Sequence, residues 1–499
     1  MSGWGGSARR LAGAVALALA LTATAVLAGW GQPGAPVFAL GDAPPPGDPA
    51  AQGRALARRP AEDLPPNGAA RARRPAGWSP AALPRGEAAP GRVGPLLGVI
   101  GYKPAVVARL DPRTLRPLPG PRIRLRYGVS GYGWSPDGSL LVLGDVDDDV
   151  LHLVDPVRLR RLGTVRFGIV ARAPRWLAWL GPRRLAVVAG DPGDGAHLLL
   201  VDPVARKVLS RRQLEPAGLS VVPAGDRLVL LQSPSDRLGP VRLLVVDARG
   251  RVRTAGLPGV TAGVQSPPNW DRPGAYAVSR DAALAVDLEG GRAFVAAAGA
   301  TVAEVDLASL QVTYRHLRQP VSLLRRLARW LVPPAEAKLS AGTWRSACWL
   351  GGGSLAIMGT DTSVTGKVPA ERRMVVRASG LKLLDTRSWT IRPLDPAASA
   401  ARWEAGRLLA FGTVWDPGSE RERGVGLTVY GPGDRRPRHL LGTQAVMDAH
   451  LDGDLVYASV DNGNEQWGRV VASLGSGRVL ASSPAPLPFL LRRGLDRSC

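Results

Sequence analysis

The best candidates for acid–base chemistry in the sequence are Asp448 and His450. They are two residues apart, so on a β-strand both side chains point to the same side. An imidazole beside a carboxylate can accept and return a proton during catalysis. If their strand is the innermost one of its sheet, we expect one of the two to approach the centre of the fold. Packing is the alternative, because His450 stands where other copies of a repeat carry tryptophan.

An acidic run offers carboxylate oxygens of the kind that bind calcium: Asp145, Asp147, Asp148 and Asp149. The run lacks the glycine and the distal glutamate of an EF-hand loop, and it falls at a predicted hairpin turn, so we favour a solvated turn. The five histidines show no metal-ligand spacing and are expected to be ordinary residues: His152, His197, His316, His439 and His450. The sequence therefore predicts neither a metal site nor a cofactor.

Motifs for nucleophilic catalysis are absent from the sequence. It contains no G-x-S-x-G elbow, no setting for a catalytic cysteine and no carboxylate cluster suited to glycoside hydrolysis. Thr365-Gly366-Lys367 lacks the upstream glycine of a phosphate-binding loop. An enzyme stays an open alternative, because active sites assemble from residues far apart in sequence, but the balance favours a protein without catalytic activity.

The candidate residues lie within a repeating unit, and Trp134 to Phe167 contains one complete copy. Apolar residues at 140–142 and 151–154 predict strands, and Pro136-Asp137-Gly138 and Asp155-Pro156 predict turns. An Asp that closes a strand can accept a hydrogen bond from the backbone two residues on, which favours a turn. The same marker recurs at Asp111, Asp202, Asp247, Asp306 and Asp385, with Gly431 and Ser473 in its place in two weaker copies.

Tryptophan occupies a second repeat position, just before a glycine-containing turn. It is found in four copies, at Trp134, Trp179, Trp349 and Trp403, while Val222, Val286 and His450 take its place in others. A large residue that recurs at one repeat position is expected to pack between neighbouring units. A ligand-stacking site is the alternative.

A period of about 40–50 residues with four short strands per unit predicts an all-β fold, the β-propeller. The segments WSPDGSLLVLGDV and LHLVDPVRLRRLGTV are similar to blades of WD40-like and YVTN-type propellers of exported bacterial proteins. This resemblance covers residues 93–491 and implies the fold without a function. The Gly-His dipeptide of true WD40 repeats is absent, and Trp-Asp occurs only as Trp270-Asp271 and Trp415-Asp416, away from the Asp markers of the repeat.

We predict about eight four-stranded blades, with seven as the alternative. The first blade, from Leu96 to about Leu125, supplies only three strands. We expect the segment from Leu487 to Leu491 to supply its innermost strand. Such a closure would pair the two ends of the propeller and remove open sheet edges.

The N-terminal region has the pattern of an export segment. In residues 1–30, Arg9-Arg10 precede an apolar run from Leu11 to Trp30. Cleavage after Ala28 fits a signal peptide, but the run nearly reaches the ~20 residues that span a bilayer, so a retained anchor helix is the alternative. Residues 31–92, rich in Pro, Ala, Gly and Arg, are expected to be a disordered linker. The body of the chain is therefore predicted to be extracytoplasmic, either secreted or anchored by the N-terminal helix.

The chain is strongly basic, with a net charge of +23. In the sequence the arginines are spread through linker, turns and strands, so we interpret them mainly as a compositional bias. No specific nucleic acid partner is expected. An anionic membrane surface is a candidate partner, and envelope polyanion binding through diffuse charge is a lesser hypothesis that predicts strong salt dependence.

Two insertions interrupt the repeat. The larger, 319–343, contains VSLLRRLARWLV, in which apolar and basic residues separate to different faces of a helix. We expect this helix to pack on the propeller or to dock on a membrane or a protein partner. Its candidate docking residues are Leu327, Trp330, Leu331, Arg325, Arg326 and Arg329. The smaller insertion, Thr360 to Arg377, is a candidate binding loop.

The two cysteines are Cys348, in a predicted strand, and Cys499, at the end of a polar tail of residues 492–499. We favour unpaired thiols over a disulfide. The whole sequence predicts a monomeric propeller that acts as a non-enzymatic binding or scaffolding module at the cell envelope, for a protein partner or small ligand that the sequence does not identify. The alternative is an exported propeller enzyme, such as a quinoprotein-like oxidoreductase, a lactonase or a lyase, with its site at the central channel.

Overall fold

The structure is a computed structural model that describes residues 96–168, 173–266, 277–299, 301–318, 340–365, 373–416, 421–432, 434, 436–461 and 467–492. The predicted export segment, 1–30, and the linker, 31–92, lie outside these residues. Within the described ranges all regular elements are β-strands. A search of the same ranges for a helix that could cross a membrane found none.

Four of the sheets contain four antiparallel strands each. The first joins β3 (Ile123–Leu125), β2 (Ala105–Leu110), β1 (Leu96–Ile100) and β34 (Phe489–Leu490). The second joins β4 (Val129–Trp134), β5 (Leu141–Asp145), β6 (Val150–Asp155) and β7 (Arg160–Arg166). The third joins β8 (Pro174–Gly181), β9 (Arg184–Ala189), β10 (His197–Asp202) and β11 (Lys207–Gln213). The fourth joins β17 (Ala283–Asp287), β18 (Arg292–Ala296), β19 (Thr301–Asp306) and β20 (Val312–His316).

Two larger sheets complete the structure. A ten-stranded sheet contains β12 (Ala217–Ala224), β13 (Arg227–Pro234), β14 (Leu238–Asp247), β15 (Val252–Gln265), β16 (Val278–Arg280), β21 (Ser340–Gly351), β22 (Ser354–Thr365), β23 (Arg373–Ala378), β24 (Leu381–Asp385) and β25 (Thr390–Asp395). An eight-stranded sheet contains β26 (Ala400–Glu404), β27 (Arg407–Asp416), β28 (Arg421–Tyr430), β29 (Arg438–Leu440), β30 (Ala445–Asp452), β31 (Leu455–Asp461), β32 (Trp467–Ser473) and β33 (Val479–Ser483).

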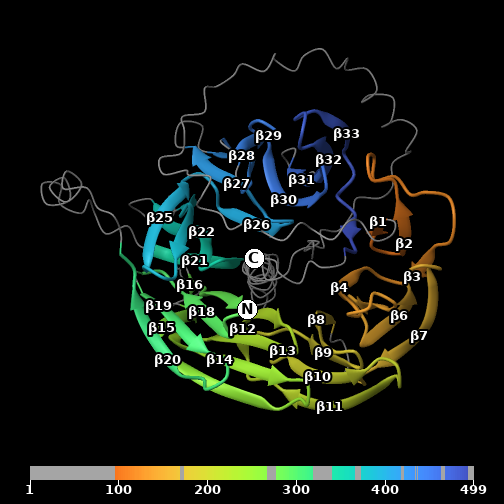
Figure 1. The fold of residues 1–499 in the computed structure, drawn as a ribbon, viewed down its shortest axis with the longest axis horizontal. Helices are drawn as coiled ribbons and strands as arrows, with labels where there is room; N and C mark the ends of the chain where they lie inside the picture. Colours follow the sequence, from red (N-terminus) through yellow and green to blue (C-terminus); the bar gives the residue numbers. More distant parts are fainter. Residues whose placement is uncertain are drawn as a thin grey trace, which may run out of the picture.

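The sheets form a ring in which one edge of each sheet faces the centre (Figure 1). This arrangement is a β-propeller, so the predicted all-β fold is confirmed. The ring is closed by the C-terminal strand, because β34 pairs with β1 in the register Gly98↔Leu490 and Val99↔Phe489. The segment predicted to complete the first sheet therefore does so.

The repeated Asp forms the turn that was predicted from its position. In the turn after β6, Asp155 Oδ1 accepts hydrogen bonds from the backbone N–H groups of Val157 at 3.0 Å and Arg158 at 2.9 Å. Leu159 then adopts a φ of 49°. Asp306 makes the equivalent pair of bonds after β19. A side-chain acceptor thus replaces the strand partner that the backbone loses at the turn.

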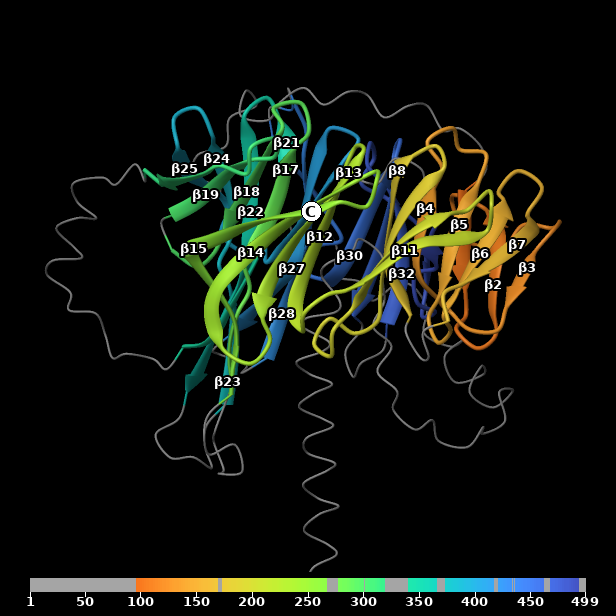
Figure 2. The ribbon, with the colours of Figure 1, turned by 90° about the horizontal axis from the view of Figure 1, so that it is seen from below.

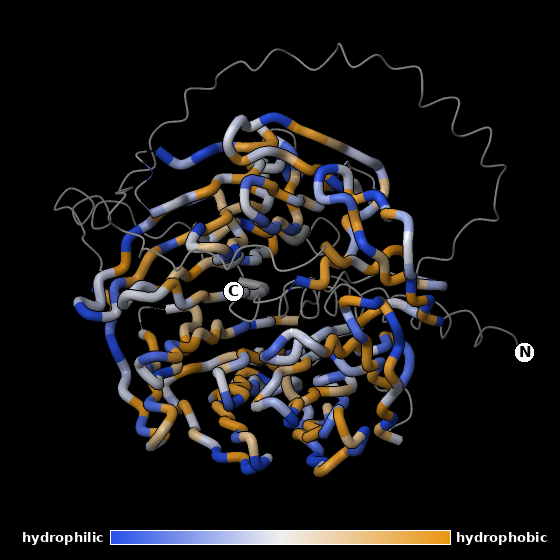
Figure 3. Tube along the Cα trace, turned by 45° about the vertical axis from the view of Figure 1, so that its right-hand side comes forward, coloured by the Kyte–Doolittle hydropathy of each residue, from blue (hydrophilic) through white to orange (hydrophobic). Residues whose placement is uncertain are grey.

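The hydrophobic core lies between neighbouring sheets. One cluster joins Leu97 and Val107 of the first sheet to Leu141 and Val154 of the second. Trp349 of β21 stacks on Phe294 of β18 with ring centroids 5.3 Å apart, which confirms the predicted packing between units. In Figure 3 hydrophobic positions run along the strands, whereas many outer turns are hydrophilic.

Both insertions differ in part from the predictions. Residues 340–343, the last four of the predicted helical insertion 319–343, belong to β21. There Gly342 pairs in parallel with Ser279 of β16. The second insertion is largely a hairpin, because β22 and β23 pair from Thr360↔Ala378 to Thr365↔Arg373. Figure 2 shows β23 extending from one face of the ring. Strand pairing across the insertion satisfies backbone groups that a loop would leave to solvent.

Candidate functional site

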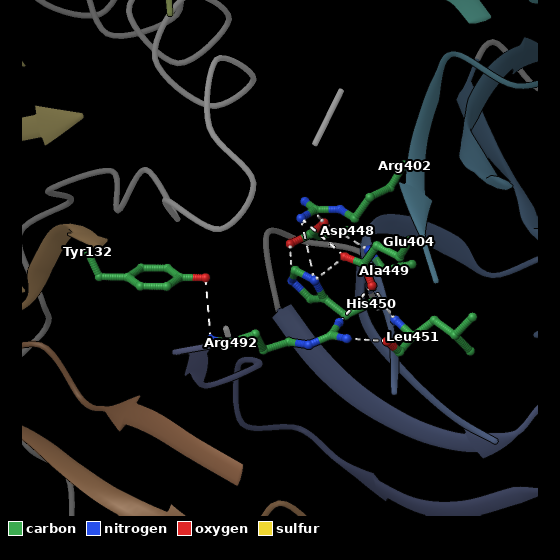
Figure 4. A network of polar contacts seen from close by, with 8 residues as sticks. All are labelled: Tyr132, Arg402, Glu404, Asp448, Ala449, His450, Leu451 and Arg492. Carbon is green, nitrogen blue, oxygen red and sulfur yellow. Dashed lines mark hydrogen bonds and ion pairs between the residues drawn. The ribbon is translucent and has the colours of Figure 1, made fainter. Parts of the chain in front are cut away.

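Five charged or ionisable side chains meet on strands near the centre of the ring (Figure 4). Arg402 and Glu404 lie on β26, Asp448 and His450 lie on β30, and Arg492 follows β34. We call these five residues the Glu404 cluster. His450 Nε2 lies 3.3 Å from Asp448 Oδ2, which confirms that Asp448 and His450 face the same side of their strand.

Glu404 is the most buried member of the cluster, with a side chain 1% exposed. Its Oε1 lies 3.0 Å from His450 Nδ1. Its Oε2 accepts hydrogen bonds from Arg492 Nη1 and from the backbone N–H of Leu451, each at 2.6 Å. Both carboxylate oxygens are therefore occupied by groups of the protein itself.

Arg402 and Asp448 form the second ion pair of the cluster. Arg402 Nη2 donates to Asp448 Oδ1 at 2.6 Å, and the arginine side chain is 8% exposed. The backbone N–H of Ala449 also donates to Asp448 Oδ1, at 2.9 Å. Asp448 is the most accessible member, at 26% exposure of its side chain.

The pKa values of both carboxyl groups follow from this arrangement. Burial by itself would raise the pKa of Glu404, but the charges of Arg492, His450 and Arg402 outweigh it and lower the pKa to about 2. For Asp448 burial also acts upward, and Arg402 and His450 outweigh it, so its pKa lies below the usual range. Both carboxyl groups are thus anionic at neutral pH.

His450 lies between the two carboxylates, and its side chain is 4% exposed. In its cationic form the ring donates from both nitrogens, so it can satisfy Glu404 at one end and Asp448 at the other. A general base needs a nitrogen that can reach a substrate, directly or through one water. His450 has neither ring nitrogen directed to solvent, so this geometry favours a structural role.

Arg492 connects the end of the described chain to three other strands. Besides Glu404 of β26, its guanidinium donates to the carbonyl of Leu451 on β30. Its backbone N–H lies 3.4 Å from the hydroxyl of Tyr132 on β4, and Tyr132 meets Phe489 of β34 edge to face at 5.4 Å. Figure 4 shows Tyr132 and the rest of the cluster on opposite sides of Arg492. The cluster therefore fastens the closure of the ring.

A cavity of about 80 Å³ with a lining of mixed polarity lies among the other inner strands. Its lining comes from β12, β17, β21 and β26 and includes Val222, Val286, Trp349 and Trp403, with Glu289 as a charged residue. The centre of the ring thus has a sector of paired charges and, apart from it, a small cavity lined by both apolar side chains and polar groups.

The sequence-based candidates have different outcomes. All six docking residues lie outside the described residues: Leu327, Trp330, Leu331, Arg325, Arg326 and Arg329. In the described part of the chain, no group of three or more His, Cys, Asp and Glu side chains is placed so that it could hold a metal ion. The interpretation of the acidic run as a solvated turn is wrong for Asp145, which ends β5, is 3% exposed and lies 3.4 Å from His152 Nε2. Pairing with β4 buries this residue.

Two further expectations need correction. Cys348 is disulfide-bonded and 3% exposed, so the expected unpaired thiol at this position is wrong; Cys499 lies outside the described residues. Sequence spacing cannot show which thiols approach each other, because a disulfide depends on a short Cα–Cα distance. The predicted polar tail, 492–499, begins with a residue of the Glu404 cluster.

Sequence reasoning missed Arg402, Glu404 and Arg492. A signal for the first two was present, since Arg402 precedes Asp448 by 46 residues and Glu404 precedes His450 by 46 residues. Trp403 and His450 take the same place in successive repeats and are 47 residues apart, so each pair lies within one position of the repeat spacing, and opposite charges so placed can meet on adjacent inner strands. Arg492 has no such signal, because it lies beyond the last repeat.

No family model matches the chain, and no curated protein does. Among solved structures, the chain is similar to the C-terminal WD40 domain of Sif2, with 13% identity, 76% of this chain and 92% of that one covered, and a TM-score of 0.47. It is also similar to the dihydro-heme d1 dehydrogenase NirN in complex with DHE, with 15% identity, coverage of 82% and 76%, and a TM-score of 0.46. For BamB from Moraxella catarrhalis the values are 10%, 72%, 90% and 0.37. By its own strand order, this chain is a β-propeller.

Proposed function

We propose that the protein is an extracytoplasmic β-propeller that serves as a non-enzymatic binding or scaffolding module at the cell envelope. One observation carries this proposal: the charged side chains that converge near the centre of the ring bind one another. Glu404 and His450 have their polar atoms occupied within the cluster and have side chains 1% and 4% exposed. Because the polar groups at the centre bind one another, partners would bind to the faces and the outer wall of the propeller.

The proposal includes eight blades. Four sheets already have four strands each. We divide the ten-stranded sheet into β12–β15 and β21, β22, β24 and β25, with β16 and β23 as additions between and beside them. We divide the eight-stranded sheet into β26–β29 and β30–β33, which meet through the single pair Gly412↔Val446. A seven-bladed propeller would require that one of these four-stranded groups is not a blade of the ring.

The proposal also includes export by residues 1–30, a tether formed by residues 31–92, and a docking helix in the insertion 319–343. The helix would present Arg325, Arg326 and Arg329 to an anionic membrane or to a protein partner. These features rest on the sequence pattern. An exported chain would be released with the periplasmic fraction if it is cleaved, or would be cut in its linker by protease added to spheroplasts if it is anchored, whereas a cytoplasmic chain would be neither released nor cut.

An exported propeller enzyme is the second candidate, and the position of Asp448 favours it. This carboxylate contacts His450, and 26% of its side chain is accessible near the centre of the ring. A substrate that entered there would meet a carboxylate beside an imidazole.

Complementation distinguishes the two candidates. In a strain that lacks the protein, we would express the His450→Gln and Asp448→Asn variants and measure their folded fraction by protease resistance alongside the growth phenotype. A scaffold predicts that function follows the folded fraction, so that a variant folded at low temperature complements there. An enzyme predicts folded variants that fail to complement at every temperature, and that result would overturn the proposal.

A further inference from the structure

The outer edge of the second and third sheets concentrates positive charge. The outermost strands β7 and β11 each carry three cations and no carboxylate: Arg160, Arg161, Arg166, Lys207, Arg211 and Arg212. All six are exposed. In the sequence they are dispersed over more than fifty positions with acidic residues between them, but the fold brings the two strands to the outer wall of the ring (Figure 1). We call these six residues the basic rim.

Contacts between the two sheets make the rim one surface. Arg206, in the turn before β11, reaches across β7 and donates to the carbonyl of Leu162 at 2.6 Å. Gly163 leaves room for this guanidinium, since a Cβ there would lie 2.6 Å from Arg206 Cζ. Arg211 donates to the carbonyl of Phe167 in the same way. These arginines therefore bridge the sheets through carbonyl oxygens, and the bridges leave their charge uncompensated.

Two carboxylates compensate only one cation of the rim, Arg166, and a third pairs outside it. Asp148 and Asp149 lie 3.7 and 3.5 Å from Arg166. Asp202 lies 3.1 Å from Arg183, outside the rim. Among the described residues, Arg160, Lys207 and Arg212 have no ion pair. The rim thus keeps a net positive charge.

Apolar side chains accompany this charge at equivalent positions of the two sheets. Val157 and Val204, in the turns before β7 and β11, are 71% and 62% exposed. Leu162 and Leu209, on the strands themselves, are 36% and 42% exposed. To bind an anionic polymer, the surface would need only the cations. A lipid surface offers both anionic headgroups for the cations and an apolar phase that the apolar side chains can enter.

We infer that the basic rim, with Val157 and Val204, is a docking surface for an anionic lipid bilayer. It is separate from the docking helix proposed above, and either can be correct without the other. Charges on edge strands also prevent pairing with other chains, which is the simpler explanation of the rim. That explanation does not require the exposed valines, and the outer strand β33 carries no charged residue at all.

The test compares the partition of the full-length chain onto vesicles of phosphatidylcholine with and without about one third phosphatidylglycerol, at about 0.1 M salt. The ratio of the two partition coefficients is the measured quantity, because the apolar N-terminal segment contributes to both. Each cation near an anionic surface contributes a factor of about five, so the charge reversals Arg160→Glu, Lys207→Glu and Arg212→Glu together should lower the ratio by about a hundredfold or more.

Three controls make the result specific. Arg423→Glu, Arg436→Glu and Arg478→Glu change the net charge equally on exposed positions of other sheets and should leave most of the ratio intact. Reversal of Arg325, Arg326 and Arg329 tests the docking helix alone. Circular dichroism and protease resistance check that each variant is folded.

The valines separate lipid from polymer. Val157→Ser with Val204→Ser should weaken binding to anionic vesicles several-fold but should not change binding to soluble dextran sulfate. A rim variant that binds anionic vesicles as well as the control variant would overturn the inference. Rim-dependent binding to dextran sulfate without binding to vesicles would also overturn it, in favour of an anionic polymer.

Discussion

Asp281 offers a quantitative test of how this fold tolerates a partly buried charge. The residue lies between β16 and β17, and its backbone N–H donates to the carbonyl of Thr343 at 2.8 Å. Burial raises the pKa of its carboxyl group from 3.8 to about 6. The hydroxyl groups of Ser279 on β16 and Thr343 on β21, which is paired with β16, are buried and make no hydrogen bond to any part of the chain that the structure describes.

The sign and size of the effect follow from this shift. The pKa of Asp281 is higher in the folded protein, so as pH rises its carboxyl group loses the proton at a lower pH in the unfolded chain than in the folded one. The stability of the protein therefore falls as pH rises from about 4 to about 6. A shift of about two pKa units corresponds to about 3 kcal/mol at neutral and alkaline pH. Asp281→Asn removes this charge. The free energy of unfolding of the variant, relative to that of wild type, should therefore increase by about 2–3 kcal/mol between about pH 4 and about pH 8.

The measurement is urea unfolding of wild type and Asp281→Asn at both pH values, followed by the fluorescence of the 14 tryptophans and by circular dichroism. The change between pH values is the useful quantity, because the cost of burying the asparagine amide is similar at both. Asp236→Asn is a matched control, since the side chain of Asp236 is 74% exposed. An equal effect of Asp281→Asn at the two pH values would refute the reasoning.

Three further predictions concern the packing and polar contacts of the ring. Glu404→Gln leaves Arg492 and His450 without their buried carboxylate and should lower the free energy of unfolding by about 3–5 kcal/mol in urea titrations. A loss below about 1 kcal/mol would contradict the structural role of the cluster. Because the pKa of Glu404 is lowered, the stability of the wild type should also fall as pH drops from about 4.5 towards 2. Trp349→Ala removes the ring that stacks on Phe294 and should cost about 3 kcal/mol, whereas Trp349→Phe should cost less, as thermal unfolding would show. Asp155→Ala loses two bonds to backbone N–H groups and should cost about 1 kcal/mol, with Asp155→Asn retaining most of the stability; equal losses in the two variants would argue against the turn bonds.

Local patterns predicted the repeating parts of this fold. The Asp at the end of a strand, the turn after it and the tryptophan before the next hairpin depend on residues close in sequence, and Asp155 and Trp349 adopt the predicted roles. Even the closure by the segment around Leu490 was predictable, because the first sheet lacked one strand. The hairpin β22–β23 was not predicted, because its strands belong to an insertion of mostly polar residues.

The candidate site was predicted only in part. Asp448 and His450 were found because two residues on one strand share a side. Their partners Arg402 and Glu404 lie on another strand, and Arg492 follows the last one, so no local pattern joins the five. Without these partners, the pair resembled a catalytic dyad; with them, it is a buried ion network that fastens the ring.

The amino-acid sequence by itself determined the repeat, its strands and its turns, because these depend on periodic side-chain direction and on hydrogen bonds to near neighbours. Only the tertiary structure decided where charge gathers. Ring closure brings Arg492 to Glu404, and the outward position of β7 and β11 collects arginines that are dispersed along the chain. Electrostatic interactions depend on distance in space, and that distance is set by how the sheets pack rather than by the order of residues.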